Sequence, residues 1–230
     1  MAVIDPESPC FTIVTAIDVQ GESAPGVSSL LTRRIEECAC KSSGFVSASL
    51  LARRGPASEA GVGDEPSRLL EYAQWASGAS YERFLERTDT AELSAEIVAT
   101  SISCRSETYE LDALISDRRC LDIIAPETRL TLVVIMQPHR GKQAFINRYN
   151  QAETHDFFSG FEGFLGVAFH LAESGSVLEY LQWESMRALS AASSTDRFRT
   201  HLETNEKNCD RTDFGFYDVV HTITLNVPPG

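Results

Sequence analysis

The stretch Leu70-Glu-Tyr-Ala-Gln-Trp75 occurs twice in this chain, the second time with one change as Leu178-Glu-Tyr-Leu-Gln-Trp183. The two copies lie 108 residues apart, and Thr108–Leu111 matches Phe216–Val219 at the same offset. Self-similarity at one fixed offset is the signature of a repeated structural unit. The sequence therefore predicts two copies of one fold.

The offset between the copies changes once along the chain. Upstream, Phe11-Thr-Ile-Val-Thr15 matches Leu130-Thr-Leu-Val-Val134 at an offset of 119. Gly and Pro are frequent in residues 54–66, as expected for a surface loop that tolerates insertion, and one insertion there explains the change. We expect one domain over residues 1–118 and a second over residues 119–230, with residues 117–129 as the linker.

Each copy shows the same order of expected elements, strand, helix, two hairpin strands, helix and strand. This is the ferredoxin-like βαββαβ order, an α+β fold whose sheet has one face without helices. Such a face needs a partner, and here the second copy supplies it, so we expect two sheets that form one α+β barrel. The expected elements are residues 11–19, 24–41, 45–53, 68–75, 80–99 and 103–115 in the first copy, and 130–137, 142–159, 164–171, 177–183, 186–205 and 214–227 in the second.

Composition and charge exclude several classes of partner. The 230 residues carry 20 Lys and Arg against 33 Asp and Glu, a formal net charge of −13, which disfavours nucleic acid. No run approaches the roughly 18 apolar residues of a membrane span, and no secretory signal is visible at the first residues. We therefore expect a cytoplasmic protein with its six cysteines reduced. The five histidines show no metal-binding spacing, so we expect no metal site.

Alternation along the repeated strand divides its side chains between two faces. Glu71 and Trp75 point one way and Tyr72 the other, and the second copy repeats this with Glu179 and Trp183. A carboxyl group in an aromatic-lined space between sheet and helices acquires a raised pKa, which suits a general base. The alternative is that the Trp fills the core while the Glu pairs with an Arg.

The segment Tyr72-Ala-Gln-Trp75-Ala-Ser77, followed by Tyr81, resembles the signature of the antibiotic biosynthesis monooxygenase family. The second copy carries Tyr180-Leu-Gln-Trp183-Glu-Ser185, and the resemblance covers about 100 residues in each half. It implies a dimeric α+β barrel built here from a single chain. That internal pairing makes a monomer sufficient, and a homodimer stays open.

The resemblance also implies a reaction, the oxygenation of a polycyclic aromatic polyketide such as an anthrone, with O₂ as substrate and no metal. Tandem members resemble this chain in outline and open rings of angucycline-type polyketides. The implied cofactor is therefore either none or reduced flavin (FADH2 or FMNH2) as a diffusible cosubstrate, supplied by a flavin reductase partner. Family roles fall on an Asn, a Trp and a Tyr. Trp75 and Tyr81 match two of these roles, Glu71 and Glu179 take the Asn position, and Leu189 replaces the second Tyr.

A second group of candidates comes from the hairpin strands. Alternation groups His170 with Phe164, Gly166 and Ala168, where small residues would leave room for a flat ligand beside a histidine. A locally hydrogen-bonded surface histidine is the alternative. Residues 205–213 are expected to form a loop. The expected catalytic residues are Glu71, Trp75, Tyr81, His170, Glu179 and Trp183, and the expected substrate-binding residues are Ser47, Ser49, His155, Phe164 and Ala168.

Three functions stay open from the sequence. The first is an oxygenase of polycyclic phenols. The second is a non-oxidative polyketide cyclase or isomerase, because a carboxylate base in the same barrel could drive enolisation. The third is a small-molecule binding protein without turnover. The halves are expected to be unequal, since only the first keeps Tyr81 and only the second carries His170.

Overall fold

The computed structural model describes residues 2–8, 10–55, 67–123 and 129–225. Serine hydroxyls begin a helix at the same place in each half: Ser77 accepts from the backbone N–H of Ser80, and Ser185 from that of Ala188. The elements are β1 (Ala2–Ile4), β2 (Phe11–Val19), α1 (Ala24–Arg33), β3 (Phe45–Arg53), β4 (Ser67–Trp75), α2 (Gly78–Leu85), α3 (Thr88–Thr100), β5 (Ser103–Ile115), β6 (Leu121–Ile123), β7 (Leu130–Pro138), α4 (Gln143–Asp156), β8 (Phe164–Leu171), β9 (Val177–Trp183), α5 (Met186–Ser193), α6 (Asp196–Asn208) and β10 (Cys209–Thr224).

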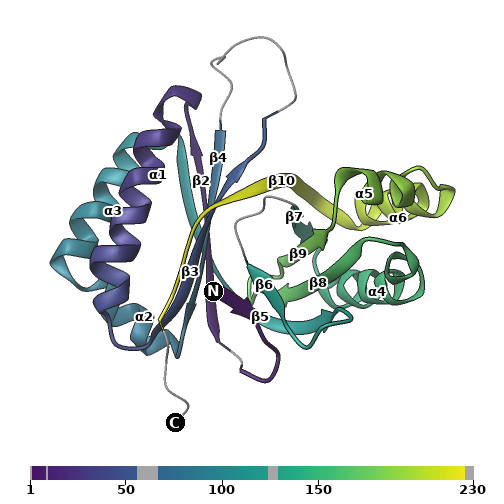
Figure 1. The fold of residues 1–230 in the computed structure, drawn as a ribbon, viewed down its shortest axis with the longest axis horizontal. Coiled ribbons are helices and arrows are strands. Elements are labelled where there is room, and N and C mark those ends of the chain that lie inside the picture. The colour runs from purple at the N-terminus through teal and green to yellow at the C-terminus, as the bar shows by residue number, and fades with distance from the viewer. Residues whose placement is uncertain (1, 9, 56–66, 124–128, 226–230) are drawn as a thin grey trace.

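Eight strands close into a single barrel in the order β10, β3, β4, β2, β5, β8, β9 and β7. The first half (β2 to β5) and the second half (β7 to β10) each contribute four adjacent strands. The last strand of each half pairs with the second strand of the other, β5 with β8 and β10 with β3. The helices of the two halves lie on opposite outer sides (Figure 1). This confirms the expected tandem ferredoxin-like α+β barrel, while the boundary after residue 118 stays a prediction.

Strand alternation divides the core into layers. Tyr72 and Tyr180 lie in the apolar interior of the barrel, with their rings 6.2 Å apart. Trp75 and Trp183 point the other way, into separate clusters beneath the helices of each half. The buried residues therefore form one interior core and helix-covered cores on both sides.

The elements differ from expectation at four places. The second helix of each half is split, because Arg87 and Thr195 have extended backbones before α3 and α6. In the first half, the α-helical part of the first helix ends at Arg33, and a π-helical turn over Arg34–Cys38 follows it directly. Residues 205–213 are not a loop: α6 runs to Asn208 and β10 starts directly at Cys209. The expected last strand reaches residues 226 and 227, which lie outside the described residues.

The linker contains structure of its own. Within residues 117–129, β6 pairs antiparallel with β1 near the start of the chain. Ala2, Ile4, Leu121 and Ile123 are almost fully buried in the interior core of the barrel. The linker therefore adds apolar surface to that core. Within the described residues, no helix has the length and apolar character needed to cross a membrane.

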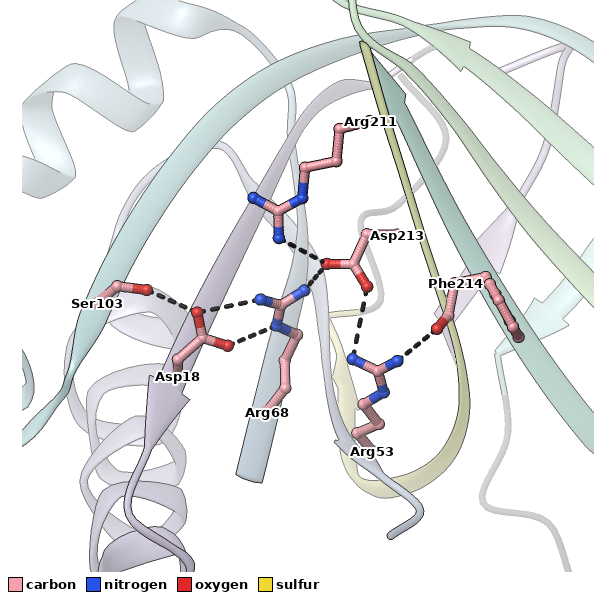
Figure 2. A network of polar contacts seen from close by, with 7 residues as sticks. All are labelled: Asp18, Arg53, Arg68, Ser103, Arg211, Asp213 and Phe214. Atoms are coloured by element: carbon pink, nitrogen blue, oxygen red, sulfur yellow. Dashed lines mark hydrogen bonds and ion pairs between the residues drawn. The ribbon is translucent and has the colours of Figure 1, made fainter. Parts of the chain in front are cut away.

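A polar network joins the two halves at the β4–β10 side of the barrel (Figure 2). Arg68 on β4 pairs with Asp18 on β2, with 2.6 Å between Nε and Oδ1, and also with Asp213 on β10. Ser103 donates to the same Asp18, and Arg53 lies 3.4 Å from Asp213. Because Arg68 is largely buried, these charge-assisted contacts fix how the halves meet.

Candidate active site

The repeated strand places its Glu and Trp on the helix side of the sheet in both halves, as alternation predicts. Glu71 contacts Arg34 of the π-helical turn, and Glu179 accepts from Asn150 of α4. Tyr81 packs beside Trp75, with 5.7 Å between ring centroids. Five of the expected catalytic residues therefore lie between sheet and helices, but in two separate groups, one in each half.

The sixth, His170, lies on the other face of the sheet. It is fully buried inside the barrel, where its Nε2 is 2.9 Å from the hydroxyl oxygen of Tyr72. This burial lowers the pKa of His170 to about 4. The expected grouping of His170 with Phe164 is wrong, because a β-bulge at Leu165 shifts the alternation between them.

The bulge also separates Phe164 from Ala168. Phe164 packs against Trp183 on the helix side, with 5.1 Å between ring centroids, whereas Ala168 lies in the interior core. A Cβ at Gly166 would lie only 2.7 Å from the Cβ of Ser116, at a φ of +148°. The glycine therefore serves close packing and leaves no room for a ligand.

The two first-half serines also face the barrel interior. Ser47 Oγ donates to Gln74 Oε1 at 2.6 Å, and Ser49 Oγ lies 2.9 Å from Thr222 Oγ1. These hydrogen bonds satisfy them within the protein. His155 is 79% exposed on α4 and pairs with Asp156. None of these three residues lines the space beside Glu71 or Glu179.

A cavity of about 590 Å³ lies between the sheet and the helices of the second half. Its floor includes Leu132, Leu181 and Trp183 of the sheet, and helices α4, α5 and α6 contribute walls. Met186 and Leu202 among its lining residues are about half exposed, and the lining residues Glu206, Asp210 and Arg211 are exposed as well, so the cavity opens through a mouth of mixed character. Its volume and mostly apolar lining are typical of sites for flat organic ligands.

Among the described residues that line this cavity, Glu179 is the one buried carboxyl group. Its Oε1 accepts from Asn150 Nδ2 at 2.7 Å, and no cation pairs with it among the described residues. Burial raises the pKa of Glu179 to about 7, against a smaller lowering by the hydrogen bond from Asn150. A carboxyl group with this pKa exchanges a proton readily at neutral pH.

Two further polar residues of the cavity come from α6. Asn205 Nδ2 and His201 Nε2 are 3.2 Å apart, and both side chains are more than nine-tenths buried. The His201 ring stacks on Tyr149 and meets the edge of Phe158. Burial lowers the pKa of His201 to about 4, so its imidazole is neutral at pH 7.

The first half has aliphatic residues at the matching positions. Leu93 and Ile97, 108 residues before His201 and Asn205, belong to buried apolar clusters. Leu31, 119 residues before Asn150, does the same. Beside them, the ion pair of Arg34 with Glu71 takes the place of the Asn150–Glu179 contact.

Asn150, His201 and Asn205 are the site residues that the sequence reasoning missed. The signal was present in the repeat, because comparison of the two copies shows an aliphatic residue exchanged for a polar one at each position. The His201–Asn205 spacing of four also places both on one face of a helix. Among the described residues, no group of three His, Cys, Asp or Glu is arranged to hold a metal ion.

Comparison with known proteins rests on structure, since no family model and no curated protein matches the sequence. An anthrone oxidase-like protein superimposes with a TM-score of 0.80 at 14% identity, over 98% of both chains. A presumed monooxygenase of Fusobacterium nucleatum gives a TM-score of 0.65 at 7% identity, covering 94% of this chain and 95% of its own. Another from Lactobacillus acidophilus gives 0.56 at 6% identity, covering 95% and 100%. The chain therefore has the tandem ferredoxin-like barrel fold of these monooxygenase-type structures.

Proposed function

We propose that the protein is an oxygenase that oxidises a polycyclic phenol in the second-half cavity, with Glu179 as the general base. One observation carries the proposal: a buried carboxyl group, which has no cationic partner in the described part of the chain, lines a largely apolar cavity of about 590 Å³. The fold shared with an anthrone oxidase-like protein supports the reaction class by analogy.

The reaction that fits this site is the oxidation of an anthrone to an anthraquinone. Glu179 removes a proton from the substrate, and the electron-rich anion that results passes an electron to O₂. The reduced oxygen then bonds to the ring carbon of the substrate CH₂ group. Loss of water leaves a carbonyl there: one oxygen atom enters the product, and the other leaves as water with the two hydrogens. One O₂ is consumed per substrate, and no external reductant is required.

The surroundings of Glu179 support this role. Asn150 donates to one carboxyl oxygen and so fixes the orientation of the group. Trp183 and Phe158 provide flat apolar walls, against which an aromatic substrate can pack. A general base contributes about 10²–10⁴-fold in rate, and exclusion of water by these walls protects the reactive anion.

Reduced flavin fits the cavity poorly. Among the described residues that line it, Arg211 is the single permanent cation, and Arg211 already lies 3.4 Å from Asp213. Glu206 and Asp210 at the same mouth would repel a flavin phosphate. The proposed reaction therefore does not use flavin. Ring opening of an angucycline-type polyketide would differ, because inserting one oxygen atom there consumes two electrons from a reductant.

Oxygen consumption with 1,8-dihydroxyanthrone tests the proposal. We expect enzyme-dependent uptake of one O₂ per anthrone converted, and ¹⁸O₂ should place one labelled atom in the 1,8-dihydroxyanthraquinone product. Heat-denatured protein corrects for spontaneous oxidation, and a parallel reaction with reduced FMN measures any dependence on flavin.

Two other outcomes would favour a different function for this protein. Conversion of a substrate that continues without O₂ would favour the cyclase or isomerase. Saturable binding of the quinone without any conversion of the anthrone would favour a binding protein. Either result would reject the oxygenase.

A further inference from the structure

The wall of the second-half cavity formed by α6 contains two unsatisfied polar side chains. His201 and Asn205 lie one helical turn apart and line the cavity. They contact one another, but in the described part of the chain His201 Nδ1 and Asn205 Oδ1 have no hydrogen-bond partner. His201 is 8% exposed and Asn205 is 6% exposed.

The hydrogen-bonding roles of these atoms follow from their chemistry. Asn205 Nδ2 can only donate, so His201 Nε2 accepts from it and is not protonated. A neutral imidazole then carries its proton on Nδ1, which is left as a donor. Asn205 Oδ1 is left as an acceptor. The pair thus has one unused donor and one unused acceptor, on two residues that line the same cavity.

Unpartnered polar atoms in a buried position lower the stability of the fold unless a ligand binds them. A buried donor or acceptor without a partner destabilises the fold by about 1–3 kcal/mol. The first half avoids this cost with Leu93 and Ile97 at the same positions, so the fold itself does not require polar residues there. A ligand with matching groups would satisfy both atoms.

Charge limits which ligand can enter. Glu206 and Asp210 line the mouth, and Arg211 there is close to Asp213. Inside the cavity, burial raises the pKa of Glu179. A second negative charge beside its carboxylate would add electrostatic repulsion. The cavity therefore favours a neutral ligand over a carboxylate or phosphate.

We propose that His201 and Asn205 recognise a neutral aromatic ligand that carries a carbonyl and a hydroxyl group on one edge. His201 Nδ1 donates to the carbonyl oxygen, and Asn205 Oδ1 accepts from the hydroxyl. This inference rests on the proposed function only in taking the second-half cavity as the substrate site. It adds the two residues that recognise the ligand and the edge of the ligand that they bind.

Calorimetric titration with 1,8-dihydroxyanthraquinone tests this recognition without turnover. His201→Leu and Asn205→Ile introduce the first-half residues, and each should weaken binding about tenfold through the loss of one buried hydrogen bond. His201→Gln keeps a donor and should bind within threefold of the wild type. Glu203→Gln, an exposed neighbour on α6, is the matched control and should leave Kd unchanged.

A charged ligand tests the expected preference for a neutral one. The 3-carboxylate of the same quinone should bind at least tenfold more weakly than the neutral compound. If folded His201→Leu and Asn205→Ile proteins bind the neutral quinone within twofold of the wild type, or if the wild type does not bind it, the inference is wrong. If recognition behaves as expected but no anthrone-dependent oxygen uptake occurs, the oxygenase fails while this inference stands.

Discussion

The two halves share a fold and a repeated Glu-Tyr-x-Gln-Trp strand, yet they use the same glutamate in opposite ways. In the first half Glu71 pairs with Arg34, and aliphatic side chains fill the neighbouring positions. In the second half Glu179 accepts a hydrogen bond from the neutral Asn150 and lines a cavity. One chain therefore contains the strand glutamate in two environments, as a buried ion pair and as a buried carboxyl group beside a neutral amide.

A small number of exchanges produces this difference. Leu31, Leu93 and Ile97 correspond to Asn150, His201 and Asn205. An aliphatic side chain at such a position contributes packing, whereas an amide or imidazole gives up packing and places hydrogen-bonding atoms beside the cavity. These three positions pack a core in the first half, and the second half carries the chemistry that we propose.

The largest expected effect is a difference in activity between variants of the two glutamates. Glu179→Gln removes the proposed base and should lower kcat for anthrone oxidation by about 10²–10⁴-fold. Glu71→Gln, the same change in the first half, should leave kcat within threefold once activity is expressed per folded protein. Steady-state oxygen uptake measures both. Equal losses in the two variants would reject the assignment of the chemistry to one half.

The next effect is a difference in stability between variants of the two glutamates. Glu71→Gln leaves the buried Arg34 without its carboxylate, which should lower the free energy of unfolding by about 3 kcal/mol. The ion pair raises the pKa of Arg34 despite burial, so the guanidinium remains charged and unpaired in the variant. Urea denaturation at pH 7 measures the loss. A change below about 1 kcal/mol would show that the pair is not a stabilising element.

Glu179→Gln should instead increase the free energy of unfolding, and only at high pH. The pKa of Glu179 rises from 4.5 to about 7 on folding, so the folded wild type binds more protons and loses stability as the pH increases from 4.5 to 7. The glutamine variant lacks this loss. It should match the wild type near pH 4 and exceed it by about 3 kcal/mol at pH 8. Urea denaturation at both pH values checks the sign, and a constant difference would contradict it.

The sequence predicted the fold well because the repeat and the strand alternation are local patterns. The positions of Glu71, Trp75, Glu179 and Trp183 on the helix side follow directly from alternation with a period of two. The grouping of Phe164 with His170 was wrong because one extra residue, Leu165, reverses the alternation, and a bulge leaves no clear signal in composition.

The location of the cavity was harder to predict. Helix α6 continues through residues that are too polar to indicate a buried helix end, so His201 and Asn205 were not connected with Glu179. Only tertiary packing shows that they share a cavity. The exchange of aliphatic for polar residues between the copies is the comparison that would have indicated it.

The smallest effect concerns the contact that orients the base. Asn150→Leu introduces the first-half residue and removes a hydrogen bond that lowers the pKa of Glu179. The midpoint of the pH profile of kcat should therefore move above its wild-type value near 7, with about tenfold lower activity at pH 7 and recovery at higher pH. Loss of activity at every pH would indicate that Asn150 acts on the fold and not on the base.

The most direct test of the central claim uses the two tryptophans, one in each half. Trp75→Phe leaves only Trp183 to fluoresce, and Trp183→Phe leaves only Trp75. Each protein is titrated with 1,8-dihydroxyanthraquinone, and its fluorescence quenching is followed to saturation. A quinone in the second-half cavity lies against Trp183, so the Trp75→Phe protein should keep the wild-type Kd and show the stronger quenching. Stronger quenching of Trp75 would place the ligand in the first half and contradict the account.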